Sequence, residues 1–233
     1  MNLKNNETEA MTANKSKSNV DLQVTLQPNT LQLIDCMDFM RECPSNYFDL
    51  AIVDPPYGMN VTKLKIKANK KGKDWDASPP DLEYYNELFR VSKNQVVWGM
   101  NFLNDYLPRS ERTVVWDKQN DGTYGSDYEL AWTSFKGAKQ LIYRQMWYGY
   151  FYPKEDLPLL HPTQKPLGLY RFLLNEFAKA GDKILDTHVG SGSSLVACKE
   201  LGFEYYGCEI DEEYFAKANE RIARAYRKYE LFE

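Results

Sequence analysis

The tetrapeptide Asp54-Pro55-Pro56-Tyr57 combines the side-chain types in this chain that best suit chemistry on a small planar ligand. It directly follows the apolar run 50–53, which is typical of a buried strand. Prolines have no backbone N–H and cannot extend a strand ladder, so nearby carbonyl groups stay available to a ligand. A carboxylate, a free carbonyl and an aromatic ring together suit an exocyclic amino group on a heterocycle. The plainer interpretation is a strand that ends in a turn, with Pro-Pro as its stop signal.

A glycine-rich turn is the second candidate site. It lies between the apolar run 184–185 and a helix-like segment that begins at Ser193. Glycine allows a ligand to approach the backbone closely, and the free N–H groups of a helix N-terminus favour an anion. Some twenty residues later Glu209 follows another apolar run, where a carboxylate can bind the two hydroxyls of a ribose. The pattern indicates a nucleoside-containing cofactor, although tight strand-to-helix turns often need glycine in any case.

Strand-like and helix-like segments must position these residues, and they alternate along the chain. We expect strands at 31–34, 50–53, 95–99, 114–116, 128–133, 183–185 and 205–208, and helices at 35–40, 82–91, 166–180, 193–200 and 212–229. This alternation predicts an α/β fold with a Rossmann-like, doubly wound and mostly parallel sheet. Ligands of such sheets bind beyond the carboxyl ends of the strands. Asp35, Asp54, Asp186 and Glu209 all follow predicted strands, so we expect them at one edge.

The chain is expected to form a single domain over residues 21–233, preceded by a polar, disordered tail at 1–20. A basic loop spans about 58–76, and the segment from about 118 to 160 is irregular and rich in aromatic residues. The net charge of −4 argues against a protein that coats nucleic acid without specificity, but it allows a local basic patch.

Cysteine and histidine usage argues against a metal site. The four cysteines have no C-x-x-C spacing and there are only two histidines, so we expect neither zinc nor a disulfide framework. The chain has no signal peptide and no run of eighteen apolar residues, which favours a soluble, cytoplasmic protein without a membrane partner.

Four segments, taken in order, resemble the amino-group DNA methyltransferases that use S-adenosylmethionine, in the permuted arrangement where the catalytic motif precedes the cofactor motif. The matching segments are 33–36 through 54–57, Trp98-Gly99-Met100-Asn101-Phe102, His161-Pro162-Thr163-Gln164-Lys165-Pro166, and 186–211. Together they span about residues 30–225. The Asp-Pro-Pro-Tyr version resembles the enzymes that methylate adenine N6, whereas enzymes that methylate cytosine N4 more often have serine in place of the aspartate.

The resemblance implies a role for each matching residue. Asp54 and the Pro55 carbonyl accept hydrogen bonds from the target amino group, Pro56 completes the catalytic motif, and Tyr57 stacks on the base. Glu209 holds the ribose hydroxyls of the cofactor. The full set of implied cofactor residues is Asp35, Thr163, Lys165, Asp186, Thr187, His188, Gly190, Gly192, Ser193, Glu209 and Ile210.

Three of these implied cofactor roles need comment. Asp35 is expected near the adenine edge of the cofactor, and Thr163 with Lys165 at its methionine carboxylate. The pair Thr187-His188 replaces the usual Pro-Phe, so the ring of His188 is expected to pack against the cofactor less tightly than phenylalanine does.

The partner implied by the resemblance is double-stranded DNA, from which the target base is flipped out. The segment at about 118–160 is expected to be a small target-recognition insertion. The expected DNA contacts are Lys63, Lys65, Lys67, Lys70, Lys71 and Lys73 of the basic loop, with Lys136, Lys139 and Arg144 of that insertion. The resemblance also allows a homodimer and a companion restriction endonuclease, in a bacterial or phage-encoded system.

The predicted function is therefore methylation of adenine N6 in a short specific DNA sequence. Cytosine-N4 methylation stays open, because this type of pocket accepts either amino group. A catalytically silent DNA-binding relative also stays open, on account of Thr187-His188. Methylation of RNA or of protein glutamine is less favoured, because those relatives have asparagine in place of Asp54 and the opposite motif order.

Overall fold

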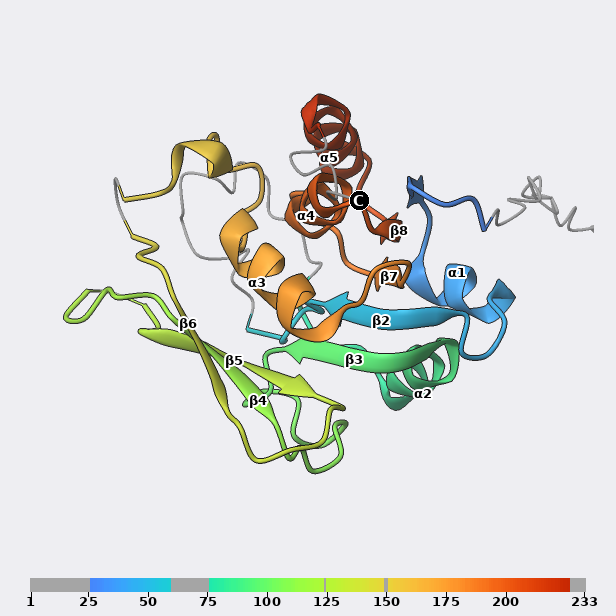
Figure 1. Ribbon diagram of the computed structural model, residues 1–233, viewed down its shortest axis with the longest axis horizontal. Coiled ribbons are helices and arrows are strands. Elements are labelled where there is room, and N and C mark those ends of the chain that lie inside the picture. Colours follow the sequence, from blue (N-terminus) through green and yellow to red (C-terminus); the bar gives the residue numbers. More distant parts are fainter. Residues whose placement is uncertain (1–25, 60–75, 124, 149–150, 227–233) are drawn as a thin grey trace, which may run out of the picture.

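The computed structural model describes residues 26–59, 76–123, 125–148 and 151–226 (Figure 1). The predicted tail and the six lysines of the basic loop lie outside these residues. Within the described part, eight strands form one sheet in the order β1-β8-β7-β2-β3-β5-β4-β6. The strands are β1 (Thr30–Leu33), β2 (Phe48–Val53), β3 (Ser92–Trp98), β4 (Thr113–Asp117), β5 (Tyr128–Thr133), β6 (Leu141–Arg144), β7 (Lys183–Asp186) and β8 (Glu204–Glu209). All of them run in one direction except β5, which confirms a mostly parallel sheet.

Helices cover both faces of this sheet, as the doubly wound prediction requires. They are α1 (Cys36–Glu42), α2 (Leu82–Val91), α3 (Leu167–Phe177), α4 (Ser193–Leu201) and α5 (Glu212–Arg224), with a short 3-10 turn at Lys154–Asp156. Helices α3, α4 and α5 share one hydrophobic core with the sheet and gather on one side of it in Figure 1. Helices α1 and α2 share a second core with the other face. No helix within the described ranges is long and apolar enough to cross a membrane.

Acidic residues fix the start of three helices and so set where the chain turns after a strand. The carboxylate of Asp35 accepts from the Met37 N–H at 2.7 Å, and Asp81 and Asp211 begin α2 and α5 in the same way. Such caps satisfy backbone donors that have no partner inside the helix. Asp35 and Asp211 thus place α1 and α5 directly beyond the carboxyl ends of β1 and β8.

The segment 118–160, expected to be irregular, contributes two strands to the sheet: β5, which was predicted, and β6, which was not. β5 pairs with β3 and β4, and β6 extends the sheet beyond β4. The residues of β6 include the exposed Ile142 and Arg144, because an edge strand has a partner on one side only. This edge strand offers only the short apolar run 141–143, and so short a run is hard to assign to a strand from sequence. The predicted helices at 166–180 and 212–229 are also shorter, ending at Phe177 and Arg224.

The topology places the ends of β2 and β7 side by side at the point where the winding reverses. From β7 the chain passes to β8 on one side, and from β2 it passes to β3 on the other. Asp54 follows β2 and Asp186 ends β7. Crevices at such a switch point are the usual ligand sites of open α/β sheets.

Candidate active site

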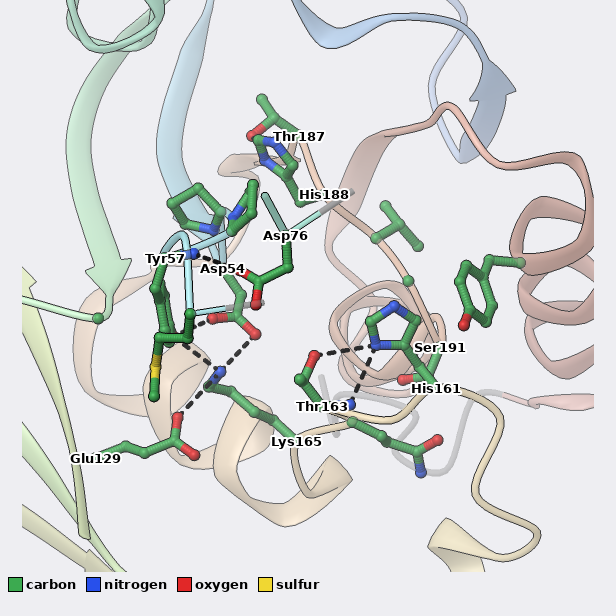
Figure 2. A pocket seen from close by; sticks show the side chains of 18 of the residues that line it. Asp54, Tyr57, Asp76, Glu129, His161, Thr163, Lys165, Thr187, His188 and Ser191 are labelled. Atoms are coloured by element: carbon green, nitrogen blue, oxygen red, sulfur yellow. Dashed lines mark hydrogen bonds and ion pairs between the residues drawn. The ribbon is translucent and has the colours of Figure 1, made fainter. Parts of the chain in front are cut away.

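One cavity of about 670 Å³ lies over the carboxyl ends of these strands and brings all four predicted segments together. Its walls include the catalytic tetrapeptide, part of the glycine-rich turn and residues of the segment 161–166 (Figure 2). Of the predicted cofactor residues, the cavity is lined by Asp35, Thr163, Lys165, Thr187, His188, Gly190, Glu209 and Ile210. Its volume lies within the range of sites for drug-sized ligands.

The side chain of Asp54 lines the cavity, and both of its carboxylate oxygens have donors. The Tyr57 hydroxyl donates to Oδ1, and the Lys165 ammonium donates to Oδ2 (Figure 2). Burial raises the pKa of Asp54 above its usual range, and the nearby Lys165 only partly opposes this shift. Asp54 is therefore a carboxylate with increased affinity for a proton, placed where a ligand can reach it.

Lys165 contacts two carboxylates, a contact that sequence reasoning did not anticipate. Its Nζ donates to Asp54 Oδ2 and lies 3.2 Å from Glu129 Oε2. The other carboxylate oxygen of Glu129 lies 2.7 Å from Lys118 Nζ. Burial by itself would lower the pKa of Lys165, but Asp54 and Glu129 together raise it. The resemblance implied the carboxylate of the cofactor as the partner of Lys165. In the structure the Lys165 ammonium instead contacts Asp54, Glu129 and the Tyr57 hydroxyl. An acid inside the apolar strand Tyr128–Thr133 was the available signal for Glu129.

The ring of Tyr57 is fixed by close packing. It stacks on Phe102 with a centroid distance of 5.3 Å and an interplanar angle of 16°. Gly99 has φ +82°, and a Cβ added there would lie 2.5 Å from Tyr57 Cδ1. Only glycine permits both this backbone conformation and the approach of the ring. Gly99 and Phe102 of the segment 98–102 thus fix the position of the Tyr57 ring.

Asp76 holds the backbone of the catalytic loop and was missed by sequence reasoning. Its Oδ1 accepts from the N–H groups of Tyr57 and Gly58, each at 3.0 Å, and the side chain is buried at the cavity wall (Figure 2). A carboxylate that accepts two backbone bonds fixes the direction in which the chain leaves β2. Nothing in the spacing of Asp76 after the lysine-rich run signals this contact.

Glu209, at the end of β8, lines the cavity beside the glycine-rich turn. Its Oε2 accepts from the Gly190 N–H at 2.8 Å and its Oε1 from the Asp211 N–H at 2.9 Å. Burial raises its pKa, and these two backbone bonds oppose the shift. Each carboxylate oxygen retains a lone pair, so the group still has capacity for the hydroxyls of a ligand.

Three predicted cofactor residues shape the glycine-rich turn and do not line the cavity. Asp186 accepts from the His188 N–H at 2.9 Å and from the Ser194 hydroxyl, and burial raises its pKa to about 7. Gly192 has φ +81° and packs against Ala218, while the Ser193 hydroxyl accepts from Arg221 at 2.8 Å. Direct contact of these side chains with a ligand in the cavity is therefore not supported; they hold the turn in place.

His188 does line the cavity and is neutral at ordinary pH. Burial lowers its pKa to about 4, although Asp35 opposes the shift. Its Nδ1 lies 2.9 Å from Thr187 Oγ1, and the hydroxyl of Tyr84 lies 2.7 Å from the same Oγ1. The Thr187-His188 pair is thus bonded to α2, and the ring remains a flat, uncharged wall of the site.

His161 also lines the cavity, although it was not among the predicted cofactor residues. Its ring packs edge-on against Tyr214 at 4.4 Å, and its Nδ1 lies 3.0 Å from Thr163 Oγ1 (Figure 2). The ring also lies over Gly190, where a Cβ would approach it to 3.5 Å. The rings of His161 and Tyr214 thus form an aromatic wall of the cavity beside the glycine-rich turn.

The described DNA candidates do not cluster at the cavity. Lys136 and Lys139 lie on the connection after β5, at the end of that antiparallel strand away from Asp54. Arg144 lies at the cavity end of β6, where it forms an ion pair with Asp117 at 3.2 Å. Lys136 and Lys139 are separated from Asp54 by the length of β5, so their position does not support a DNA contact beside the cavity.

Comparisons with known proteins give matches over most of the chain. The DNA methylase family N6_N4_Mtase matches residues 82–220. The Type II methyltransferase M2.LlaDCHI of Lactococcus lactis subsp. cremoris is 31% identical over 237 residues, covering 81% of this chain and 87% of its own length.

Two solved structures have the same fold. The crystal structure of an M1.HpyAVI–SAM complex has a TM-score of 0.55 at 22% identity and covers 83% of this chain and 98% of its own. The PvuII DNA methyltransferase, described as cytosine-N4-specific, has a TM-score of 0.55 at 12% identity, covering 82% and 85%.

Proposed function

Since this chain belongs to the N6_N4_Mtase family of DNA methylases, we propose that it methylates the N6 amino group of an adenine in a short, specific sequence of double-stranded DNA. The observation that carries the proposal is a single cavity with two different carboxylates on its walls. Asp54, beside Tyr57, suits an amino group on a planar base, and Glu209, beside Gly190, suits the hydroxyls of a ribose.

The residues around Glu209 fit S-adenosylmethionine as the cofactor. The buried carboxylate retains acceptor capacity, the positive φ of Gly190 brings backbone close to the cavity, and His161 adds an aromatic wall. When bound, S-adenosylmethionine supplies a methyl group that its sulfonium has already activated. Asp35, Thr163, His188 and Ile210 line the same cavity and complete the candidate contacts.

The task of the catalytic residues is to orient the target amino group. The lone pair of an adenine amino group is delocalised into the ring, so acceptors that hold its hydrogens favour a nitrogen directed at the methyl group. Asp54 Oδ1 and the Pro55 carbonyl are the proposed acceptors. In the ligand-free structure the Tyr57 hydroxyl occupies Oδ1, so the amino group joins or displaces it. Catalysis then depends on orientation and electrostatics, with no covalent enzyme intermediate.

The target base has to leave the duplex before it can reach Asp54, because the cavity lies at the edge of the sheet. Stacking on Tyr57 would recover part of the cost of unstacking. Phe102, stacked on Tyr57 and partly exposed, is the side chain that the base encounters beside it. Double-stranded DNA is accordingly the proposed substrate.

Aspartate at the first position of the tetrapeptide supports adenine over cytosine. Cytosine-N4 methylation is the second candidate, because the family covers both activities and a cytosine-N4 enzyme shares the fold. Long-read sequencing of DNA from cells that express the protein, with nucleoside analysis of the same DNA, separates the two. We expect N6-methyladenine in one sequence motif, absent from an Asp54→Ala control. N4-methylcytosine alone would replace the first proposal with the second.

The remaining candidate is a silent DNA-binding relative. Titration calorimetry with S-adenosylmethionine tests it, because a silent protein with an altered Thr187-His188 pair would fail to bind. A companion restriction endonuclease and a homodimer stay proposals that rest on relatives named as type II methyltransferases. Gene-neighbour analysis and sedimentation of the purified protein are the direct tests of these two.

A further inference from the structure

Four charged side chains of alternating sign cross the catalytic side of the cavity. Lys118 Nζ lies 2.7 Å from Glu129. Glu129 lies 3.2 Å from Lys165 Nζ, and the Lys165 ammonium donates to the Asp54 carboxylate (Figure 2). They come from separate parts of the sheet: Lys118 follows β4, Glu129 is on β5, Lys165 precedes α3 and Asp54 follows β2. The topology, and not sequence proximity, has therefore assembled this array.

Lys165 contacts two carboxylates, Asp54 and Glu129, and the two differ in how strongly nearby lysines stabilise their charge. The Lys165 side chain is 3% exposed, so its ammonium depends on Asp54 and Glu129 for stabilisation. Glu129 has a second lysine, and although burial acts to raise its pKa, Lys165 and Lys118 together lower it. Among the described residues, Asp54 pairs with a single cation, Lys165, and its pKa is raised. Glu129 is the stable anion of the pair, while Asp54 is the more basic one.

We propose that Glu129 is a positioning residue for methyl transfer, which draws part of the Lys165 ammonium away from Asp54 and so keeps Asp54 a strong acceptor for the target amino group. The inference rests on the proposed function and concerns the same site. Without Glu129, Lys165 would pair with Asp54 alone. A carboxylate held in an exclusive buried ion pair accepts a further hydrogen bond, or a proton, less readily.

The chemical step requires such an acceptor. The lone pair of the amino nitrogen forms a bond to the methyl carbon, the carbon–sulfur bond breaks with its electrons remaining on sulfur, and the nitrogen must lose one proton. Asp54 is the base beside this nitrogen in the proposed complex. Its basicity therefore affects the rate, as in general-base catalysis.

The decisive variants change charge without changing shape. Glu129→Gln retains an oxygen for Lys165 but removes the negative charge that raises the pKa of Asp54. We expect the acid limb of the kcat–pH profile to move to lower pH by about one unit. Without the charge of Glu129, the Lys165 ammonium acts on Asp54 alone, and a nearby opposite charge lowers the pKa of a carboxyl by about that much. We expect kcat on its plateau to fall about tenfold, within the range of a weakened general base. The KM for S-adenosylmethionine should change by less than about twofold, as for a contact made only in the transition state.

Lys118→Gln should have the opposite effect on the acid limb. Without Lys118, Glu129 engages Lys165 more strongly, so the pKa of Asp54 rises and the limb moves to higher pH. The double variant, whose net charge equals that of the parent, should lie between the two. A merely structural role for Glu129 would not produce shifts of opposite sign.

The other titratable groups that face Asp54 are Tyr57 from its own loop, Tyr170 from α3 and Asp186 from β7. They are the same in every variant, so they cannot produce a difference between Glu129→Gln and Lys118→Gln.

A second measurement does not depend on turnover. Carbon-13 NMR of aspartate carboxyls in the ligand-free protein, with the Asp54 signal assigned by its absence in Asp54→Asn, reports the Asp54 pKa directly. It should fall in Glu129→Gln and rise in Lys118→Gln. Glu176→Gln is the matched control, since Glu176 forms a comparable half-buried ion pair with Arg112 outside the cavity.

An unchanged Asp54 pKa in both variants, or a shift of the same sign in both, would overturn the inference. If Glu129→Gln does not fold, Lys118→Gln still tests the sign. A parent protein that methylates no DNA refutes the proposed function, whereas a parent that methylates DNA with variants that behave as the parent refutes only the role of Glu129.

Discussion

The ammonium of Lys165 donates a hydrogen bond to the carboxylate of Asp54, although 111 residues separate them in the chain. Parallel strands bring this about, because Asp54 leaves the end of β2 and Lys165 enters α3 beside it. Burial of both groups makes the pair sensitive to any change of charge nearby.

Asp54→Ala should abolish methylation and leave cofactor binding intact. The change removes the proposed acceptor of the target amino group, while Lys165 keeps Glu129 as a partner. Loss of one such electrostatic group lowers kcat by at least about a hundredfold. Methyl incorporation into DNA measures the loss, and calorimetry with S-adenosylmethionine should give a Kd close to that of the parent. Asp49→Ala, at the other end of β2, is the control that should retain activity; full activity of Asp54→Ala would refute the role of Asp54.

Gly99→Ala should displace the ring of Tyr57. The added Cβ would lie 2.5 Å from Tyr57 Cδ1, at a backbone φ of +82°. We expect a loss of stability of about 1–3 kcal/mol, typical of overpacking, and a large fall in activity. Gly122→Ala separates strain from collision, because Gly122 has φ +77° and no atom within 4 Å of its added Cβ. Thermal unfolding and methylation assays should show a larger loss for Gly99→Ala than for Gly122→Ala. Equal losses would show that the contact between position 99 and the Tyr57 ring is unimportant.

Asp76→Ala should impair catalysis more than cofactor binding. The substitution removes the acceptor for the N–H groups of Tyr57 and Gly58, so the catalytic loop loses its fixed direction. A fall in kcat of about tenfold or more is expected for a displaced catalytic group. Asp76→Asn keeps an acceptor oxygen and should recover much of the rate. If the two variants were equally impaired, charge and not backbone support would be the function of Asp76.

Glu209→Gln should weaken the cofactor and leave the chemical step nearly unchanged. Both carboxylate oxygens of Glu209 accept backbone N–H groups, and an amide nitrogen would face one of those donors. We expect a rise in Kd of about tenfold or more, equivalent to at least ~1.4 kcal/mol. Calorimetry should give equal losses for S-adenosylmethionine and S-adenosylhomocysteine, because both contain the ribose. A loss confined to S-adenosylmethionine would place Glu209 at the sulfonium instead.

Asp186 should make the protein less stable as pH rises from about 4 to about 7. Burial raises its pKa from the ordinary value of 3.8 to about 7, so in this window the folded state holds a proton that the unfolded state releases. The contribution is about 1.4 kcal/mol per pH unit. His188, whose pKa is lowered, has the opposite dependence below its ordinary value of 6.5.

Comparison of Asp186→Asn with the parent isolates the aspartate, because His188 is common to both proteins. The difference in unfolding free energy between them, measured by denaturant titration, should move in favour of Asp186→Asn as pH rises through this window. A difference that is independent of pH would show that Asp186 titrates normally.

The sequence by itself determined the sheet and the two halves of the site. Apolar runs such as 50–53 end in acids, and residues directly after parallel strands must meet at one edge, so Asp54 and Glu209 were correctly expected in one cavity. Helix 82–91 and strand 128–133 were predicted to the residue, because local pattern and capping agree there. The edge strand β6 was missed, since four residues with one partner strand carry little pattern.

The tertiary structure alone decided which groups touch. Glu129 lies on β5 and pairs with Lys118, which follows the adjacent strand β4, but its other partner, Lys165, precedes α3 in a distant segment of the chain. The contact between Glu129 and Lys165 therefore had no local signal. The same reason explains why Asp186 turns into the glycine-rich loop while Glu209 lines the cavity, although both end a strand. A residue's place directly after a parallel strand fixes which edge of the sheet it reaches. The direction and the charge of its side chain there depend on burial and on partners from distant segments, which only the folded chain supplies.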